Sequence, residues 1–228
     1  MTLSCLTLFM KAPPSLVAAL FWWLGFATAP GQLITIEPDD YADRTVLTGL
    51  FSEVMLSTTL SDNVPVGLFV VTAHDDGFDF APTGQRVFGH AHVPFWNNER
   101  RLRMDFAGLV STIQIDFAGG NSFTQERGRI DVYGTGDILL DSYTTGLLGG
   151  GQVDTMAISR PAPDIQWAVA YVPSGEGSFG RLDHLAFSAP VPEPSSLALA
   201  GAGLLTLWVW RRRRAPSPRS PDSGQTIV

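Results

Sequence analysis

The sequence contains one cysteine and one lysine. The cysteine is Cys5, at the extreme amino terminus, so the body of the chain has no internal disulfide and no cysteine-based metal or redox site. The stability of the folded part must therefore come from the burial of apolar side chains.

Positive charge is also scarce between residues 32 and 189. This region has nine arginines and no lysine against 20 aspartates and glutamates, which gives a formal charge of −11. Such a surface excludes nucleic acid as a natural partner. It suits an exported domain and could accompany a divalent cation, although solvation alone is sufficient reason for the acids.

Recognisable catalytic motifs are absent too. The sequence has no Gly-x-Ser-x-Gly elbow, no His-Glu-x-x-His zinc motif, no phosphate loop and no dinucleotide-binding glycine pattern. Paired carboxylates of the kind that a glycosidase uses arise by chance among so many acids. We therefore expect a protein that is not an enzyme and has no catalytic residues, with a secreted hydrolase as the less favoured alternative.

The amino terminus has the layout of a secretory signal. Lys11 precedes an apolar run at 16–26, and small residues follow at 27–29. The apolar run is too short for a comfortable membrane span. Cleavage after position 29 would leave a proline next to the cut bond, so we predict a signal peptide at 1–31 that signal peptidase removes between Gly31 and Gln32.

The body consists of short runs in which apolar and polar residues alternate. In the run from 165 to 171, Ile165, Trp167, Val169 and Tyr171 share one face, which predicts that Trp167 lies in the core. The runs that show strand periodicity are 51–56, 66–72, 102–106, 113–117, 129–133, 155–158, 165–171 and 182–187.

Turn-forming glycines, prolines and aspartates separate these runs, and no helix-length stripe of period 3.6 is present. Eight to ten strands at this spacing predict an all-β domain over residues 32–189. We expect two packed antiparallel sheets in a jelly-roll-like β-sandwich, with a closed barrel as the alternative.

Four acidic residues are candidate calcium ligands. Glu37, Asp39 and Asp40 lie near the mature amino terminus, and Asp183 lies on the last predicted strand. Because the ends of a sandwich domain are often close together, these carboxylates can meet. Carbohydrate-binding sandwiches hold a structural calcium ion in a similar way, so calcium is the possible cofactor.

Two weaker metal candidates accompany them. Three carboxylates surround a glycine turn at 75–79, which suits either a calcium loop or an acidic β-turn. His90 and His92 would share one face of a strand and could hold zinc with His74 or Asp75, although solvated surface histidines are the simpler interpretation.

Aromatic residues in polar surroundings are candidates for sugar contacts. Trp96 is followed by a polar stretch at 97–99 and is the best candidate for a glycan contact in an exposed loop. Tyr41 and Tyr143 are further candidates if they are exposed.

The carboxy-terminal region has three consecutive parts. The motif residues Pro192, Glu193 and Pro194 come first, an apolar run follows at 197–210, and a basic cluster ends the segment with Arg211, Arg212, Arg213 and Arg214. The prolines favour an extended backbone that a protease can bind as an added strand. The arginines would hold that end in the cytoplasm and leave the body outside.

This segment resembles the PEP-CTERM sorting signal, with Pro192, Glu193 and Pro194 at the motif positions and the four arginines at the basic end. The resemblance implies cleavage by an exosortase, an integral-membrane cysteine protease of Gram-negative bacteria that produce extracellular polysaccharide. The region 110–188 also resembles the sandwich domains found upstream of such signals. We expect a sorting and transmembrane helix at 190–214 and a disordered tail at 215–228; an ordinary carboxy-terminal anchor is the alternative.

These features predict an exported, non-enzymatic cell-surface or extracellular-matrix protein. It would pass through the inner membrane as an intermediate and associate with exopolysaccharide or a biofilm. A glycan-binding β-sandwich module with structural calcium is the alternative function.

Overall fold

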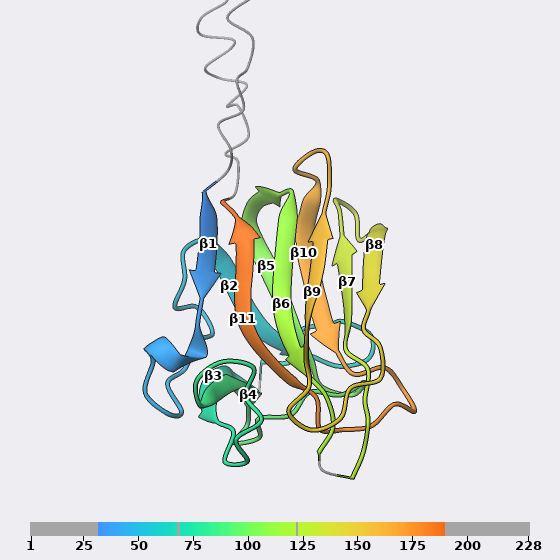
Figure 1. The fold of residues 1–228 in the computed structure, drawn as a ribbon. Coiled ribbons are helices and arrows are strands. Elements are labelled where there is room, and N and C mark those ends of the chain that lie inside the picture. Colours follow the sequence, from blue (N-terminus) through green and yellow to red (C-terminus); the bar gives the residue numbers. More distant parts are fainter. Residues whose placement is uncertain (1–31, 68, 122, 190–228) are drawn as a thin grey trace, which may run out of the picture.

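The computed structural model describes residues 32–67, 69–121 and 123–189 (Figure 1). Its elements are β1 (Leu33–Ile36), the 3-10 turn η2 (Pro38–Asp40), β2 (Val54–Thr59), β3 (Val71–Asp75), β4 (Arg86–His90), β5 (Arg101–Val110), β6 (Thr112–Ala118), β7 (Arg129–Tyr133), β8 (Leu139–Thr144), β9 (Val153–Ser159), β10 (Ile165–Tyr171) and β11 (Arg181–Ser188). None of the helical structure in these residues is long and apolar enough to cross a membrane. The predicted signal peptide, sorting segment and tail lie outside the described residues.

The strands form two separate antiparallel sheets that face each other (Figure 1). The six-stranded sheet has the order β3-β4-β11-β6-β9, with β1 also paired to β11. The five-stranded sheet has the order β2-β5-β10-β7-β8. The predicted all-β antiparallel sandwich is therefore confirmed, and the chain does not close into a single barrel.

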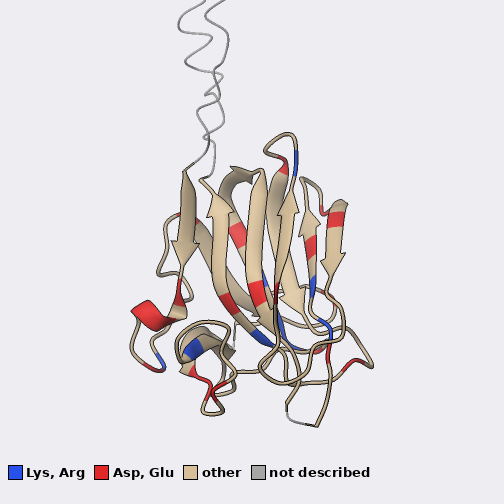
Figure 2. Ribbon diagram, viewed as in Figure 1, with Lys and Arg blue, Asp and Glu red and all other residues tan. Residues whose placement is uncertain are grey.

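The core lies between the two sheets and follows the alternation of the sequence. On β6, Ile113, Ile115 and Phe117 are fully buried, whereas Gln114 and Asp116 are partly exposed. Full burial of one such side chain contributes about 1.5–3 kcal/mol. Among the described residues, the principal core cluster extends from Ile36 to Phe187. Aspartates and glutamates occur on both strands and loops (Figure 2).

The first and last strands lie side by side. β1 pairs with β11 from Leu33↔Ser188 to Ile36↔Leu185, and the backbone N–H of Ala189 donates to the carbonyl of Gln32 at 2.6 Å. Both ends of the sandwich therefore leave the domain at the same pole (Figure 1).

The strand β10 differs from the prediction that Trp167 and Ile165 share one face. Its register with β5 shifts between Ile165 and Trp167. Ile165, Ala168 and Ala170 face the principal core, while Trp167 belongs to a second cluster with Val169 and Tyr171 on the opposite face of the five-stranded sheet. Trp167 is buried, but the prediction that it shares the core with Ile165 is wrong, because the shift transfers the following residues to the other face.

Candidate functional site

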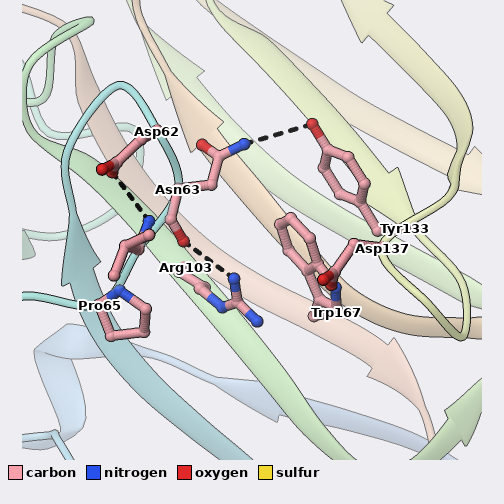
Figure 3. Close-up of a pocket in the computed structure, with 8 residues that line it drawn as sticks. Asp62, Asn63, Pro65, Arg103, Tyr133, Asp137 and Trp167 are labelled. Carbon is pink, nitrogen blue, oxygen red and sulfur yellow. Dashed lines mark hydrogen bonds between the residues drawn. The ribbon is translucent and has the colours of Figure 1, made fainter.

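A pocket of about 320 Å³ lies on the outer face of the five-stranded sheet (Figure 3). Its floor comes from β5, β10 and β7, and its walls come from the loop after β2 and the turn between β7 and β8. The lining residues are Asp62, Asn63, Val64, Pro65, Arg103, Tyr133, Asp137 and Trp167.

The pocket floor is a stack of three side chains from neighbouring strands. The rings of Tyr133 and Trp167 are parallel within 7°, with centroids 3.7 Å apart. The guanidinium carbon of Arg103 lies 3.9 Å from the Trp167 centroid. Because β5 and β7 flank β10 on opposite sides, the indole is held between the two partners. The indole N–H also donates to Oδ1 of Asp137 at 3.0 Å, which fixes the orientation of the ring.

The loop that forms one wall is attached to this floor through Asn63. Its Oδ1 accepts a hydrogen bond from Arg101 at 2.9 Å, its Nδ2 donates to the Tyr133 hydroxyl at 3.4 Å, and its carbonyl accepts from Arg103 at 2.9 Å. The φ of Asn63 is +61°, a conformation that asparagine tolerates better than most residues. Next to it, Oδ1 of Asp62 accepts from the Val64 N–H at 3.0 Å (Figure 3).

Burial and nearby charges control the ionisation of this face. Arg103 pairs with Asp105, with Nη2 and Oδ1 2.6 Å apart. Burial and the charge of Asp131 raise the pKa of Tyr133, so its hydroxyl keeps its proton and remains a donor. The same two causes raise the pKa of Tyr171 to about 12, and its hydroxyl donates to Asp131 at 2.9 Å.

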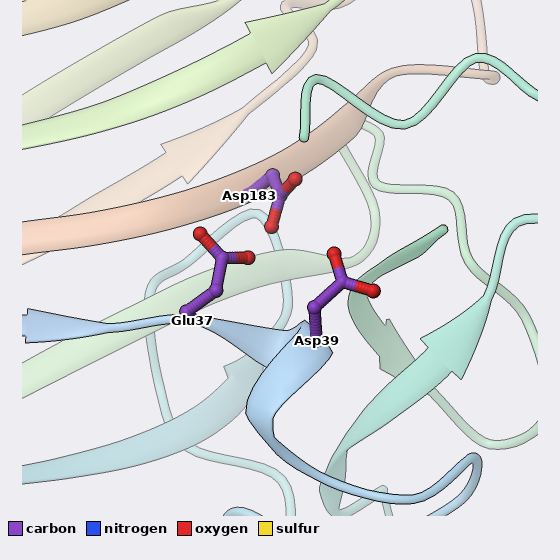
Figure 4. A group of neighbouring side chains, drawn as sticks. All are labelled: Glu37, Asp39 and Asp183. Carbon is purple, nitrogen blue, oxygen red and sulfur yellow. The ribbon is translucent and has the colours of Figure 1, made fainter. Parts of the chain in front are cut away.

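The structure brings three of the four predicted calcium ligands together. Oxygen atoms of Glu37, Asp39 and Asp183 lie within 4.8 Å of one another (Figure 4). Glu37 precedes η2, Asp39 belongs to η2, and Asp183 lies on β11, so the pairing of β1 with β11 assembles the group. Asp40 is exposed and lies outside it.

Asp183 is fully buried within this group. Burial and the charge of Glu37 raise the pKa of Asp183 to about 8. Oδ2 of Asp183 accepts from the backbone N–H and the hydroxyl of Thr83, at 3.0 and 2.8 Å, and Oδ1 accepts from the His184 N–H. No ion pair among the described residues includes Asp183. Glu37 lies 2.9 Å from Nδ1 of His184, and Asp39 lies 3.9 Å from Nη1 of Arg86. The three converging carboxylates supply oxygen atoms of the kind that calcium binds.

The prediction that Trp96 contacts a glycan from an exposed loop is wrong. It is fully buried, and its indole N–H donates to the Phe88 carbonyl at 2.6 Å. The polar residues beside it form a tight turn in which Asn97 pairs with Arg100, so they remain near the surface while the ring enters the core. Tyr41 and Tyr143 also pack against the core instead of standing exposed.

The predicted histidine site does not form. β4 ends at His90, and Ala91 and His92 follow with φ values of +44° and +73°, so the two histidines do not share a strand face. The acidic group is the only set of three or more possible metal ligands in the part of the chain that the structure describes.

The acidic turn at 75–79, a candidate calcium loop, has a structural role instead. Asp76 is buried, forms an ion pair with Arg181 and accepts a hydrogen bond from the Phe80 N–H at 2.9 Å. Its carboxylate is therefore committed to neighbours within the fold.

Sequence reasoning missed most of the pocket residues. Arg103, Tyr133 and Asp137 were not singled out, because they lie on three different elements. The available signal was the run 101–105, where Arg101, Arg103 and Asp105 alternate with apolar residues and so mark a strand whose outer face is polar.

Comparison with known proteins identifies the carboxy-terminal segment. Residues 190–214 match the family described as "PEP-CTERM protein-sorting motif". No curated protein matches the chain.

One solved structure with a similar arrangement is the K2 cleaved adhesin domain of Lys-gingipain, which is 12% identical in sequence and has a TM-score of 0.42. The alignment covers 69% of this chain and 99% of that domain. Another is the CBM22-1 xylan-binding domain from Paenibacillus barcinonensis, which is 6% identical and has a TM-score of 0.41. This alignment covers 73% of this chain and 100% of that domain. Similarities at this level carry no argument about function. The chain carries a PEP-CTERM protein-sorting motif at residues 190–214, as predicted, and the motif implies export and processing by an exosortase.

Proposed function

We propose that this protein is an exported, non-enzymatic protein of the cell surface or extracellular matrix that binds a glycan in the pocket on the five-stranded sheet. The observation that carries the proposal is the convergence of an aromatic stack, a guanidinium, an amide and two carboxylates around about 320 Å³. Exosortase processing at the PEP-CTERM motif delivers the domain to its site of action. Exopolysaccharide is the partner that this location favours.

The bonding groups of the pocket suit a sugar. Sugar hydroxyls both donate and accept hydrogen bonds, and the pocket offers carboxylate acceptors on Asp62 and Asp137 and a phenolic donor on Tyr133. Val64 and Pro65 add an apolar wall against which the C–H faces of a sugar ring can pack. The Tyr133 and Trp167 stack holds the floor rigid, which reduces the entropy cost of binding.

Binding without cleavage is supported by the sequence, which carries no Gly-x-Ser-x-Gly elbow and no His-Glu-x-x-His zinc motif.

A structural calcium ion at Glu37, Asp39 and Asp183 is the second part of the proposal. The three carboxylates converge from the first and last parts of the domain, and burial of Asp183 makes its isolated negative charge costly. Calcium would offset this charge and connect η2 to β11, at the end of the β1–β11 pair that lies away from residues 32 and 189.

The glycan proposal predicts that Tyr133→Phe weakens binding about fivefold to tenfold, because one hydrogen bond of about 1 kcal/mol is lost. Isothermal titration against exopolysaccharide of the producing organism measures the change. Tyr143→Phe is the matched control, since its hydroxyl bonds to Asp154 outside the pocket. Absence of binding to the polysaccharide, or an equal loss in both variants, would contradict the proposal.

A further inference from the structure

The two pocket carboxylates retain bonding capacity that the fold does not use. In Asp62 and Asp137, Oδ1 accepts a hydrogen bond from the protein, whereas Oδ2 accepts none from the described residues. Both residues are exposed. They come from different walls of the pocket, one from the loop after β2 and one from the turn between β7 and β8 (Figure 3).

The positive charge in the pocket is already engaged. Arg103 is the only cationic residue in the lining, and its Nε and Nη2 donate to Asp105 while its Nη1 donates to Asn63. Its remaining face lies over Trp167. An anionic sugar would have to compete with Asp105 for this guanidinium and would meet two carboxylates at the walls.

We infer that the glycan is cationic, a polysaccharide of amino sugars whose amines are not acetylated. This inference rests on the proposed glycan function of the same pocket. A protonated amine donates three hydrogen bonds, and charge-assisted bonds to Oδ2 of Asp62 or Asp137 are about twice as strong as neutral ones. The formal charge of −11 over residues 32–189 attracts such a polymer and repels uronic acids.

The ligand test uses oligomers of glucosamine, N-acetylglucosamine and glucuronic acid of equal length. They are titrated by calorimetry into the full chain in a zwitterionic detergent. We expect the glucosamine oligomer to bind at least about fivefold more tightly than the acetylated one at low salt. The preference should decrease in high salt and when the pH is raised until the amines lose their protons.

The variant test removes both pocket charges with little change of shape. In the double variant Asp62→Asn and Asp137→Asn, each amide oxygen still accepts the bond that Oδ1 accepts, from Val64 or Trp167. We expect the preference for the amine to disappear while binding of the acetylated oligomer remains. Asp141→Asn, an exposed change on β8 outside the lining, should keep the preference.

Two outcomes overturn the inference and differ in what they say about the site. Equal or tighter binding of the acetylated or uronic oligomer shows that the amine is not recognised, and glycan binding as such stands. Absence of binding by every oligomer and by the native polysaccharide overturns both the inference and the proposed function.

Discussion

Asp183 is a buried carboxyl group whose ionised form the fold disfavours. Its carboxylate is fully buried beside Glu37, and the pKa of about 8 means that the folded protein resists its ionisation. Thr83 and His184 supply hydrogen bonds but no ion pair. A bound divalent cation would remove the penalty that these neutral donors leave.

Calcium at millimolar concentration is expected to raise the melting temperature. Binding to the folded state alone contributes about 2.7 kcal/mol at 100 times the dissociation constant, which corresponds to roughly 5–10 °C for a domain of this size. Scanning calorimetry with calcium and with chelator measures the shift. Asp183→Asn should abolish the response and Asp40→Asn, outside the group, should keep it. Identical curves with calcium and chelator in the unmodified protein would rule out the calcium site.

At the scale of elements, Glu126 joins two loops at the pole opposite residues 32 and 189 (Figure 1). It is fully buried, comes from the segment between β6 and β7, and accepts backbone hydrogen bonds at 3.0 Å from Ser178 and 2.9 Å from Phe179 in the segment between β10 and β11. Gly177 leaves the space that the carboxylate occupies. The Glu126 carboxylate therefore connects the loop before β11 to the segment between β6 and β7.

Replacing Glu126 with Ala should lower the free energy of unfolding by about 2–3 kcal/mol, because two backbone donors lose their acceptor. Urea denaturation measures the loss, and faster hydrogen exchange at Ser178 and Phe179 localises it. Glu176→Ala, in the same loop but partly exposed, should cost less than about 1 kcal/mol. Similar costs for the two variants would disprove the role of Glu126.

Glu126 should also make the free energy of unfolding depend on pH. Burial raises the pKa of Glu126 above its ordinary value, so its contribution to stability is complete below the unfolded pKa and is lost as the pH rises through the folded pKa. Glu126→Gln has no ionisable group and should lack this component. Urea denaturation from acidic to neutral pH tests it, and an unchanged slope in the variant would exclude Glu126 as its source.

At the scale of the whole molecule, the sorting motif begins directly after the sandwich. Ala189 is still bonded to Gln32, and the matched segment starts at residue 190. The pole at which residues 32 and 189 lie is therefore the part of the sandwich that the motif adjoins in sequence. The pocket proposed to bind a glycan lies on the outer face of the five-stranded sheet.

We predict that an exosortase cleaves the chain near Pro192–Pro194. Glu193→Ala should leave export intact and hold the full-length protein in the inner membrane, because the exosortase no longer recognises its site. Mass spectrometry of membrane and extracellular fractions detects the change, with Glu99→Ala as an exposed control in the sandwich. Recovery of peptides from 215–228 still joined to the released domain would identify the tail as a plain anchor.

The sequence alone was sufficient for the fold class and the sorting motif. Both can be read from the order of residues along the chain. The fold class follows from period-two alternation, as at Ile113, Ile115 and Phe117. The sorting motif follows from the succession of Pro192–Pro194, an apolar run and four arginines. The meeting of Glu37 and Asp39 with Asp183 was also predictable, since the end strands of a sandwich commonly pair.

Only the tertiary structure decided which aromatic residues line the pocket. Trp96 is buried although its neighbours are polar, and Trp167 lies on the outer face because the strand register shifts after Ile165. Register depends on cross-strand pairing, which a single strand does not encode. The pocket likewise requires Asp62 from a loop, Arg103 and Trp167 from adjacent strands, and Asp137 from a turn, and packing alone brings these together.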